Sequence, residues 1–173
     1  MTRKKSSEGD QPDGLTSFPS RKKPAHYPVR QVFNRTSMVF LTVCSQDRRP
    51  LFNRSEVHAL MRMAWSAADA WRVGKYVIMP DHIHLFCVPG KHEYPALTKW
   101  VQYWKAMVSR QWIDLGEQPV WQKSFWDTQL RREESYDEKW HYVRNNPVRA
   151  GLCEKPEEWS FQGEMNVLMW HGD

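Results

Sequence analysis

The spacing of hydrophobic and polar positions predicts a fixed order of strands and helices over the first half of the chain. Residues 37–44 form a β-branched and aromatic run that ends at a polar segment, which is typical of a strand. Apolar residues recur at helical spacing over 55–71, and Ser55 can cap that helix. Residues 75–79 and 82–88 predict two short strands. Because only two residues separate them, they should form a hairpin or a tight corner.

The second half of the chain continues with two helices and one extended segment. Pro95 opens a helix whose apolar residues recur at helical spacing up to Val108. Residues 119–130 are rich in tryptophan and indicate an extended segment. A third helix begins near Ser135 and must end before Pro147, because the residue that precedes a proline disfavours the α conformation.

The order of these elements predicts the fold class. Strand, helix, strand, strand, helix and strand is the order of the split βαβ, ferredoxin-like fold, and one helix is added after it. Such a sheet carries its two helices on one face and leaves the other face free for a site. We therefore predict an α+β protein with a ferredoxin-like antiparallel sheet, helices on one face and an added C-terminal helix that bears tyrosine. The length of 173 residues suits a single domain, which we place at 26–173.

Residues 1–25 differ in composition from the rest of the chain. They are rich in Ser, Gly, Pro and basic residues and are predicted to be a disordered arm. Eight of the 25 basic residues but only three of the 20 acidic residues fall within the first 35 positions, so this end carries the whole net charge of +5. The arm is either a solvated, solubilising tail or a segment that follows DNA phosphates and makes binding sensitive to salt.

Cysteine spacing and hydropathy exclude several classes of protein. The three cysteines lie far apart and form no Cys-x-x-Cys pair, so neither a disulfide framework nor a zinc knuckle is indicated. No apolar stretch approaches the roughly 20 residues that span a bilayer, and the polar N-terminus has no signal-peptide core. We therefore expect a cytoplasmic protein without a membrane partner.

Two histidines stand in one predicted strand, at positions 82 and 84. Alternate side chains of a strand share a face, so His82 and His84 point one way together with Phe86 and Val88. The apolar residues that alternate with them point the other way, and they are Ile83, Leu85 and Cys87. The apolar set suits the helix-covered face, and the two imidazoles on the open face can bind one cation. A structural role for the pair remains an alternative, and a metal site needs a third donor from elsewhere in the fold.

The third helix offers that donor together with a nucleophile. Tyr142 and Asn146 lie four positions apart and share a helix face, so packing of this face over the open side of the sheet would bring a phenol and an amide oxygen to the imidazoles. Phenol is a poor nucleophile because its pKa is about 10, but a divalent cation on a phosphate favours its attack and yields a covalent phosphotyrosine. Tyr142 is alternatively a core residue, and Tyr136 and Tyr103 are rival nucleophiles.

Several side chains are candidates for contact with DNA. Basic residues on the second helix and around the tyrosine either bind phosphates or are solvated charges. They are Lys105, Arg110, Arg144 and Arg149. Trp121 and Trp126 either stack on bases or pack in the core.

Three motifs resemble those of one protein family. They are Met79-Pro-Asp-His-Ile-His-Leu-Phe86, Val120-Trp-Gln-Lys-Ser-Phe-Trp-Asp127 and Tyr142-Val-Arg-Asn-Asn-Pro-Val-Arg-Ala-Gly151. In order and spacing they resemble the REP-associated tyrosine transposases, from the single-tyrosine branch of the His-hydrophobic-His (HUH) nucleases. The resemblance covers roughly residues 26–162.

The resemblance implies a fold, a chemistry and roles for individual residues. It implies a ferredoxin-like fold, Mg2+ or Mn2+, and cleavage of single-stranded DNA at or near repetitive extragenic palindromes, with a 5′-phosphotyrosine link and a free 3′-OH. His82 and His84 match the metal histidines of the family and Tyr142 matches its nucleophile. Asn146 falls where related insertion-sequence transposases place a polar third ligand. Imidazole ligands also suit Zn2+ and other transition metals.

The sequence therefore predicts a site-specific DNA nickase and strand transferase that acts on a hairpin with a single-stranded flank, as a monomer or a homodimer. Bases in such a substrate need not be unpaired before they are read. The alternatives are a hairpin-binding protein that does not cut, an initiator of the rolling-circle type, and a hydrolytic nuclease that uses metal-bound water. The set of His82, His84 and Tyr142 argues against the binding protein, which needs none of them.

Overall fold

A computed structural model describes residues 38–130 and 133–169. The predicted N-terminal arm lies outside the described residues. No helix in these two ranges combines the length and the apolar character that a bilayer crossing requires.

The elements follow the predicted order. In the first half they are β1 (Val39–Cys44), α1 (Ser55–Ala67), β2 (Trp71–Ile78), β3 (His82–Pro89) and α2 (Leu97–Arg110). In the second half they are β4 (Trp126–Gln129), α3 (Glu133–Arg144), α4 (Asn146–Arg149) and β5 (Gln162–Glu164). Short 3-10 turns lie at Gln46–Arg48, Leu115–Glu117 and Pro156–Glu158.

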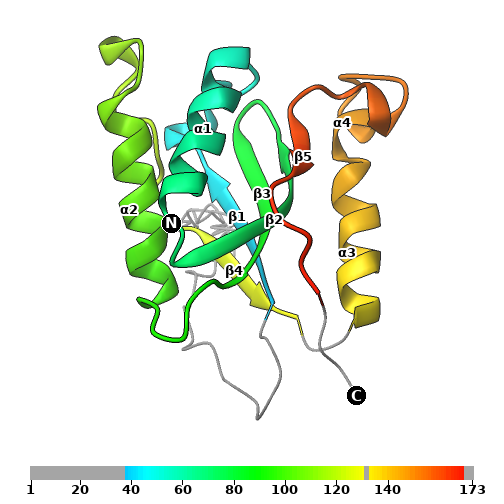
Figure 1. The fold of residues 1–173 in the computed structure, drawn as a ribbon. Coiled ribbons are helices and arrows are strands. Elements are labelled where there is room, and N and C mark those ends of the chain that lie inside the picture. Colours follow the sequence, from blue (N-terminus) through cyan, green and yellow to red (C-terminus); the bar gives the residue numbers. More distant parts are fainter. Residues whose placement is uncertain (1–37, 131–132, 170–173) are drawn as a thin grey trace, which may run out of the picture.

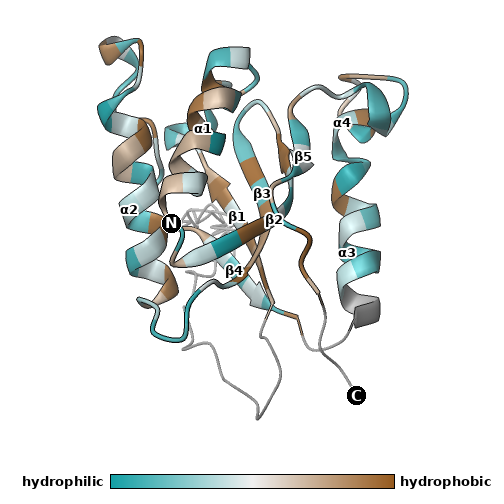
Figure 2. Ribbon diagram, viewed as in Figure 1, coloured by the Kyte–Doolittle hydropathy of each residue, from teal (hydrophilic) through white to brown (hydrophobic). Residues whose placement is uncertain are grey.

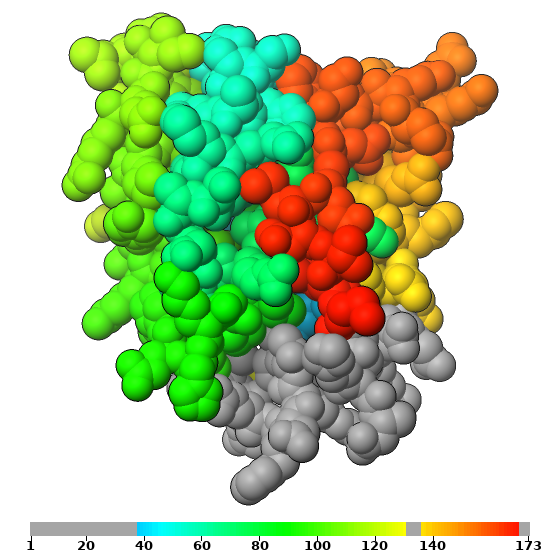
Figure 3. All heavy atoms as spheres, in the orientation of Figure 1, coloured from blue at the N-terminus to red at the C-terminus, as the bar shows by residue number. Residues whose placement is uncertain are grey.

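The strands form one sheet in the order β4-β1-β3-β2-β5, and every neighbouring pair is antiparallel. Its first four strands have the order of the ferredoxin-like fold, so the predicted fold class is confirmed. The sequence pattern missed β5, because its three residues Gln-Gly-Glu show neither alternation nor β-branched side chains. β5 pairs with the free edge of β2, and the C-terminal segment that contains it fills the surface between α1 and α3 (Figure 3).

Two predicted boundaries differ from the structure around the start of β2. The helix α1 ends at Ala67 and β2 begins at Trp71, four residues before the predicted strand. Gly74 and a register shift between Val73 and Tyr76 interrupt the strand pattern, which hid its first half. Gly74 is required because a Cβ there would lie 2.5 Å from the side chain of Leu168.

Helices cover both faces of the sheet, in two separate layers. α1 and α2 lie on one side, whereas α3 and α4 lie on the other (Figure 1). The residues Ile83, Leu85 and Cys87 are fully buried in the cluster beneath α1 and α2, and Phe86 lies in a second cluster with residues of α3. The predicted alternation of side chains along β3 is therefore confirmed, and the two histidines lie on the α3 side.

A few side chains hold α3 against the sheet, although this helix is largely hydrophilic (Figure 2). The ring of Tyr136 packs edge-on against Phe86 with centroids 4.8 Å apart, and Val143 is buried two turns further along. The ammonium of Lys75 on β2 lies 5.3 Å from the Tyr136 ring and 5.4 Å from that of Trp140. These contacts place α3 over β2 and β3, on the face of the sheet that carries the histidines.

Candidate metal and tyrosine site

The two histidines of β3 face each other through their Nε2 atoms. The Nε2 atoms of His82 and His84 lie 3.1 Å apart, and the planes of the two rings are nearly perpendicular, at 83°. Neighbouring side chains contact the other ring nitrogen, Nδ1, of each histidine. Asp81 Oδ1 lies 2.6 Å from Nδ1 of His82, and the Thr42 hydroxyl lies 2.9 Å from Nδ1 of His84.

These contacts decide how the imidazoles present their nitrogens. When Asp81 accepts a hydrogen bond from the Nδ1–H of His82, that ring presents a lone pair at Nε2. Thr42 can accept from His84 in the same way, because a hydroxyl both donates and accepts. The Phe40 ring stacks on His84 with centroids 5.4 Å apart and fixes its orientation. Partners of this kind on the far nitrogen are typical of histidines that bind metals.

The spacing of the Nε2 atoms fits a divalent cation. With bonds of about 2.1 Å, two adjacent ligands of an octahedral ion stand ~3.0 Å apart, and two ligands of a tetrahedral ion ~3.4 Å. The observed 3.1 Å is near the octahedral value. No cluster of three or more His, Cys, Asp or Glu residues that could hold a metal ion occurs within 38–130 and 133–169.

Burial keeps both imidazoles neutral. It lowers the pKa of His82, against the opposing effect of the Asp81 carboxylate. For His84, burial and the positive charges of its neighbours lower the pKa to about 3. A neutral imidazole is the form that binds a metal ion.

This low pKa of His84 predicts that the metal-free protein loses stability in mild acid. In the unfolded chain this imidazole binds a proton below pH 6.5, whereas in the folded protein it stays neutral down to about pH 3. Protons therefore bind the unfolded state preferentially, and the free energy of unfolding falls as the pH falls. The expected loss from His84 is ~2 kcal/mol between pH 6.5 and pH 5. Urea unfolding in EDTA at these pH values measures it. His84→Gln should show a smaller change with pH, and an equal change in both proteins would contradict the prediction.

Arg48 supports the histidine pair from the turn after β1. Its Nε lies 2.6 Å from Oδ2 of Asp81, the carboxylate that holds His82. Asp47 and Arg48 both have positive φ angles, 55° and 58°, which non-glycine residues seldom adopt and which often mark functional sites. Sequence reasoning missed Arg48, Asp81 and Thr42. Arg48 and Thr42 lie far in sequence from the groups that they contact, and Asp81, although next to His82, was assigned no role.

Tyr142 lies on the α3 side of the sheet and is 59% exposed. The guanidinium carbon of Arg149 lies 3.9 Å from the centroid of its ring, and Arg149 also donates a hydrogen bond to Oδ1 of Asn146. Tyr142, Asn146 and Arg149 therefore form one cluster. The prediction that Asn146 belongs to the same helix as Tyr142 is wrong in detail. α3 ends at Arg144, and Asn146 begins the short helix α4, which Gly151 terminates with a φ of +69°.

Lys139 links the part of α3 that carries Tyr142 to the surroundings of His84. One turn before Tyr142, its ammonium lies 5.3 Å from the ring centroid of Phe40, the residue that stacks on His84. Its charge is among those that lower the pKa of His84. The tyrosine is thus not buried on the opposite side of the sheet. Within the described residues, no hydrogen bond or ring contact joins Tyr142 to either histidine, so the two clusters share a face without touching.

The rival tyrosines occupy less suitable places. Tyr136 is buried against Phe86, and burial raises the pKa of its hydroxyl to about 12. Tyr103 is exposed but belongs to α2, on the other side of the sheet. Tyr142 alone of these three is exposed on the side of the histidine pair.

The structure separates the four basic residues predicted to contact DNA. Lys105 is only 8% exposed, and its ammonium donates to the backbone oxygen of Gln122 at 2.6 Å, so we do not retain it as a phosphate ligand. Burial lowers the pKa of Lys105 to about 8. Arg110 is exposed but ends α2, away from the histidines. Arg144 pairs with Glu157 near the tyrosine, where Arg149 also lies.

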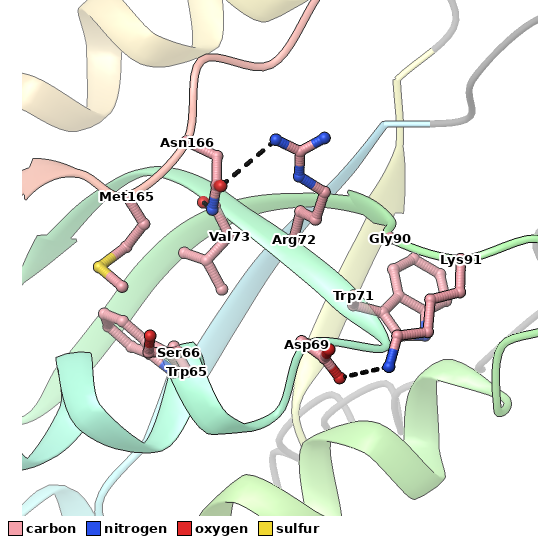
Figure 4. Close-up of a pocket in the computed structure, with 10 residues that line it drawn as sticks. All are labelled: Trp65, Ser66, Asp69, Trp71, Arg72, Val73, Gly90, Lys91, Met165 and Asn166. Carbon is pink, nitrogen blue, oxygen red and sulfur yellow. Dashed lines mark hydrogen bonds and ion pairs between the residues drawn. The ribbon is translucent and has the colours of Figure 1, made fainter.

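A cavity of about 370 Å³ lies away from these residues, between α1, β2 and the C-terminal segment (Figure 4). Trp65, Trp71 and Met165 supply apolar walls, and none of the predicted site residues lines it. Its rim is closed by an ion pair between Lys91 and Asp69 at 2.7 Å. This cavity is therefore separate from the histidine and tyrosine site.

Comparison with known proteins finds REP-associated tyrosine transposases among the relatives of this chain. The chain is 21% identical over 136 residues to a REP-associated tyrosine transposase of Escherichia coli strain K12, which covers 76% of this chain and 79% of the relative. It is 23% identical over 146 residues to a protein of Haemophilus influenzae Rd named for the same transposase family, with 76% and 82% covered. No family model matches the chain.

A solved structure shares the fold. It is a REP-associated tyrosine transposase bound to a REP hairpin, with a TM-score of 0.63, 20% sequence identity, and coverage of 77% of this chain and 79% of that one. The resemblance to REP-associated tyrosine transposases, inferred from three motifs, is therefore confirmed by sequence relatives and by fold.

Proposed function

We propose that this relative of the REP-associated tyrosine transposases is a metal-dependent endonuclease and strand transferase for single-stranded DNA, with Tyr142 as its nucleophile. The observation that carries the proposal is the pair of facing Nε2 atoms, 3.1 Å apart, on the sheet face that α3 covers with an exposed tyrosine. A protein that only binds DNA needs neither feature.

His82 and His84 would hold Mg2+ or Mn2+, and the amide oxygen of Asn146 is the candidate third ligand. Its Oδ1 accepts a hydrogen bond from Arg149, and the second lone pair of this oxygen remains for the ion. When bound, the ion supplies positive charge that offsets the charge of the scissile phosphate and orients it for in-line attack.

Tyr142 would carry out the covalent step. Its phenolic oxygen forms a bond to phosphorus while the bond from phosphorus to the 3′ oxygen breaks. The phenol gives up its proton, and the departing 3′ oxygen takes one up from water. The products are a 5′-phosphotyrosine and a free 3′-OH, and attack by another 3′-OH on the phosphotyrosine rejoins DNA and restores the phenol.

The proposed substrate is a hairpin with a single-stranded flank, of the REP type. Its support is the fold shared with a transposase whose structure contains a REP hairpin. The unpaired flank suits the chemistry, because a base outside a duplex is reached without the cost of unstacking.

Incubation with end-labelled hairpin oligonucleotides, followed by denaturing gels, tests this proposal. With Mg2+ or Mn2+ we expect a labelled protein–DNA adduct that survives denaturation, and EDTA should abolish it. Binding without an adduct would favour a hairpin-binding protein. Cleavage without an adduct would favour a hydrolytic nuclease that uses water in place of Tyr142.

A further inference from the structure

The face of the sheet that carries the histidines is covered unequally. α3 packs over β2 and β3 through Tyr136 and Val143, and it reaches β1 where Lys139 lies over the buried ring of Phe40. On β4, Trp126 and Thr128 stand on this face because they pair with Thr42 and Phe40, and both are exposed. The β4 edge of the face is therefore the part that is open to a ligand.

Trp126 lies in the same row of the sheet as the histidine pair. Thr42 pairs with Trp126 on one side and with His84 on the other, and its hydroxyl is hydrogen-bonded to the His84 ring. Two strand spacings separate the backbones of Trp126 and His84, which is roughly 10 Å. A DNA strand that runs from the histidines along this row toward the β4 edge passes over Trp126.

The exposure of Trp126 is not explained by packing. Its side chain is 48% exposed, whereas seven other tryptophans in the described residues are at most 9% exposed. No ring contact within the described parts of the chain involves its indole, and it stands on a four-residue edge strand. An indole exposed in this way adds little to the core, but it offers a flat surface on which a base can stack.

Lys139 places a positive charge over Phe40, the ring that neighbours this indole on the adjacent strand. Its ammonium lies over Phe40, and Phe40 is the diagonal neighbour of Trp126 across the β1 and β4 pair, at a typical distance of ~7–8 Å. Lys139 also precedes Tyr142 by one turn of α3, on the same flank. Lys139 therefore contacts the ring that neighbours the indole, and it shares a helix flank with the proposed nucleophile.

We propose that Trp126 and Lys139 form a binding subsite for one unpaired nucleotide of the strand that flanks the hairpin. The indole stacks on the base, and the ammonium contacts its phosphate. Stacking accepts any base, so this subsite selects a single-stranded flank rather than a sequence. The inference rests on the proposed function, since it assigns the path of the same substrate.

Equilibrium binding in EDTA, where no cleavage occurs, tests the subsite with two fluorescent hairpins, one with single-stranded flanks and one blunt. Trp126→Ala should bind the flanked hairpin about 10- to 100-fold more weakly and the blunt hairpin as wild type does. Trp126→Phe, which keeps a ring, should retain most of the affinity. Tyr103→Ala, which removes an exposed aromatic ring on the other side of the sheet, should change neither.

The lysine is tested by the dependence of binding on salt. Lys139→Ala should weaken binding of the flanked hairpin and reduce the slope of log affinity against log salt by about one, because one phosphate contact is lost. Lys99→Ala, an exposed lysine of α2 on the other side, should leave the slope unchanged.

The outcomes separate the two proposals when adduct formation by the wild-type protein is measured on the same flanked hairpin. If the wild type forms the adduct but Trp126→Ala binds both hairpins with wild-type affinity, the subsite is wrong and the proposed function stands. If the wild type forms no adduct, the proposed function fails, while a preference for the flanked hairpin that depends on Trp126 still supports the subsite.

Discussion

Tyr142→Phe is expected to abolish the covalent protein–DNA adduct and cleavage of the hairpin. The substitution removes only the phenolic oxygen and leaves the ring, on which Arg149 stacks, in place. Because that oxygen forms the bond to phosphorus, the rate should fall by at least ~10³-fold, whereas hairpin affinity should stay within a few-fold of wild type. Denaturing gels of the labelled hairpin with Mn2+ measure the adduct, and binding in EDTA measures the affinity.

Two tyrosine variants serve as matched controls. Tyr136→Phe removes a buried hydroxyl from the same helix, and Tyr103→Phe removes an exposed one from α2. Both should form the adduct at close to the wild-type rate. An adduct that persists in Tyr142→Phe and disappears in Tyr136→Phe would move the nucleophile to Tyr136 and refute the assignment.

His82→Ala and His84→Ala are each expected to abolish both metal binding and adduct formation. Each histidine contributes one of the two facing Nε2 atoms, and a single remaining imidazole on a strand has too few partners to hold the ion. We expect calorimetric titration with Mn2+ to show at least a 10-fold weaker affinity in either variant. The gel assay should show an adduct below detection at Mn2+ concentrations that saturate the wild type.

The control for this experiment is His92→Ala, an exposed histidine in the loop after β3. It should bind Mn2+ and form the adduct as the wild type does. Loss of the adduct with unchanged Mn2+ affinity in His84→Ala would show that the ion lies elsewhere and that the pair acts by another route. A wild-type rate in both alanine variants would remove the metal from the mechanism.

The assignment of His82 and His84 to one face required no structure, and the same holds for the order of the elements. Successive side chains of a strand point to opposite faces, so the apolar Ile83 and Leu85 had to share the covered face and the histidines the other. Such features follow from local covalent geometry, which is the same wherever the segment packs.

Several features that define the site depend on tertiary structure. Thr42 and Asp81 turn the two imidazoles until their Nε2 atoms lie 3.1 Å apart, and Thr42 is 42 residues from His84 in the chain. The packing of distant segments also decided between the two tryptophans, since Trp121 is buried and Trp126 is exposed.

The sequence by itself determined which side chains share a strand face or a helix flank, since the periods of 2 and 3.6 residues are local properties of the backbone. Only the tertiary structure decided which of these faces meet. Tertiary packing buried Lys105 and placed the guanidinium of Arg149 on the ring of Tyr142. It also placed α3 over β2 and β3 and left Trp126 exposed. These outcomes depend on contacts between segments far apart in the chain, and no periodicity within either segment specifies them.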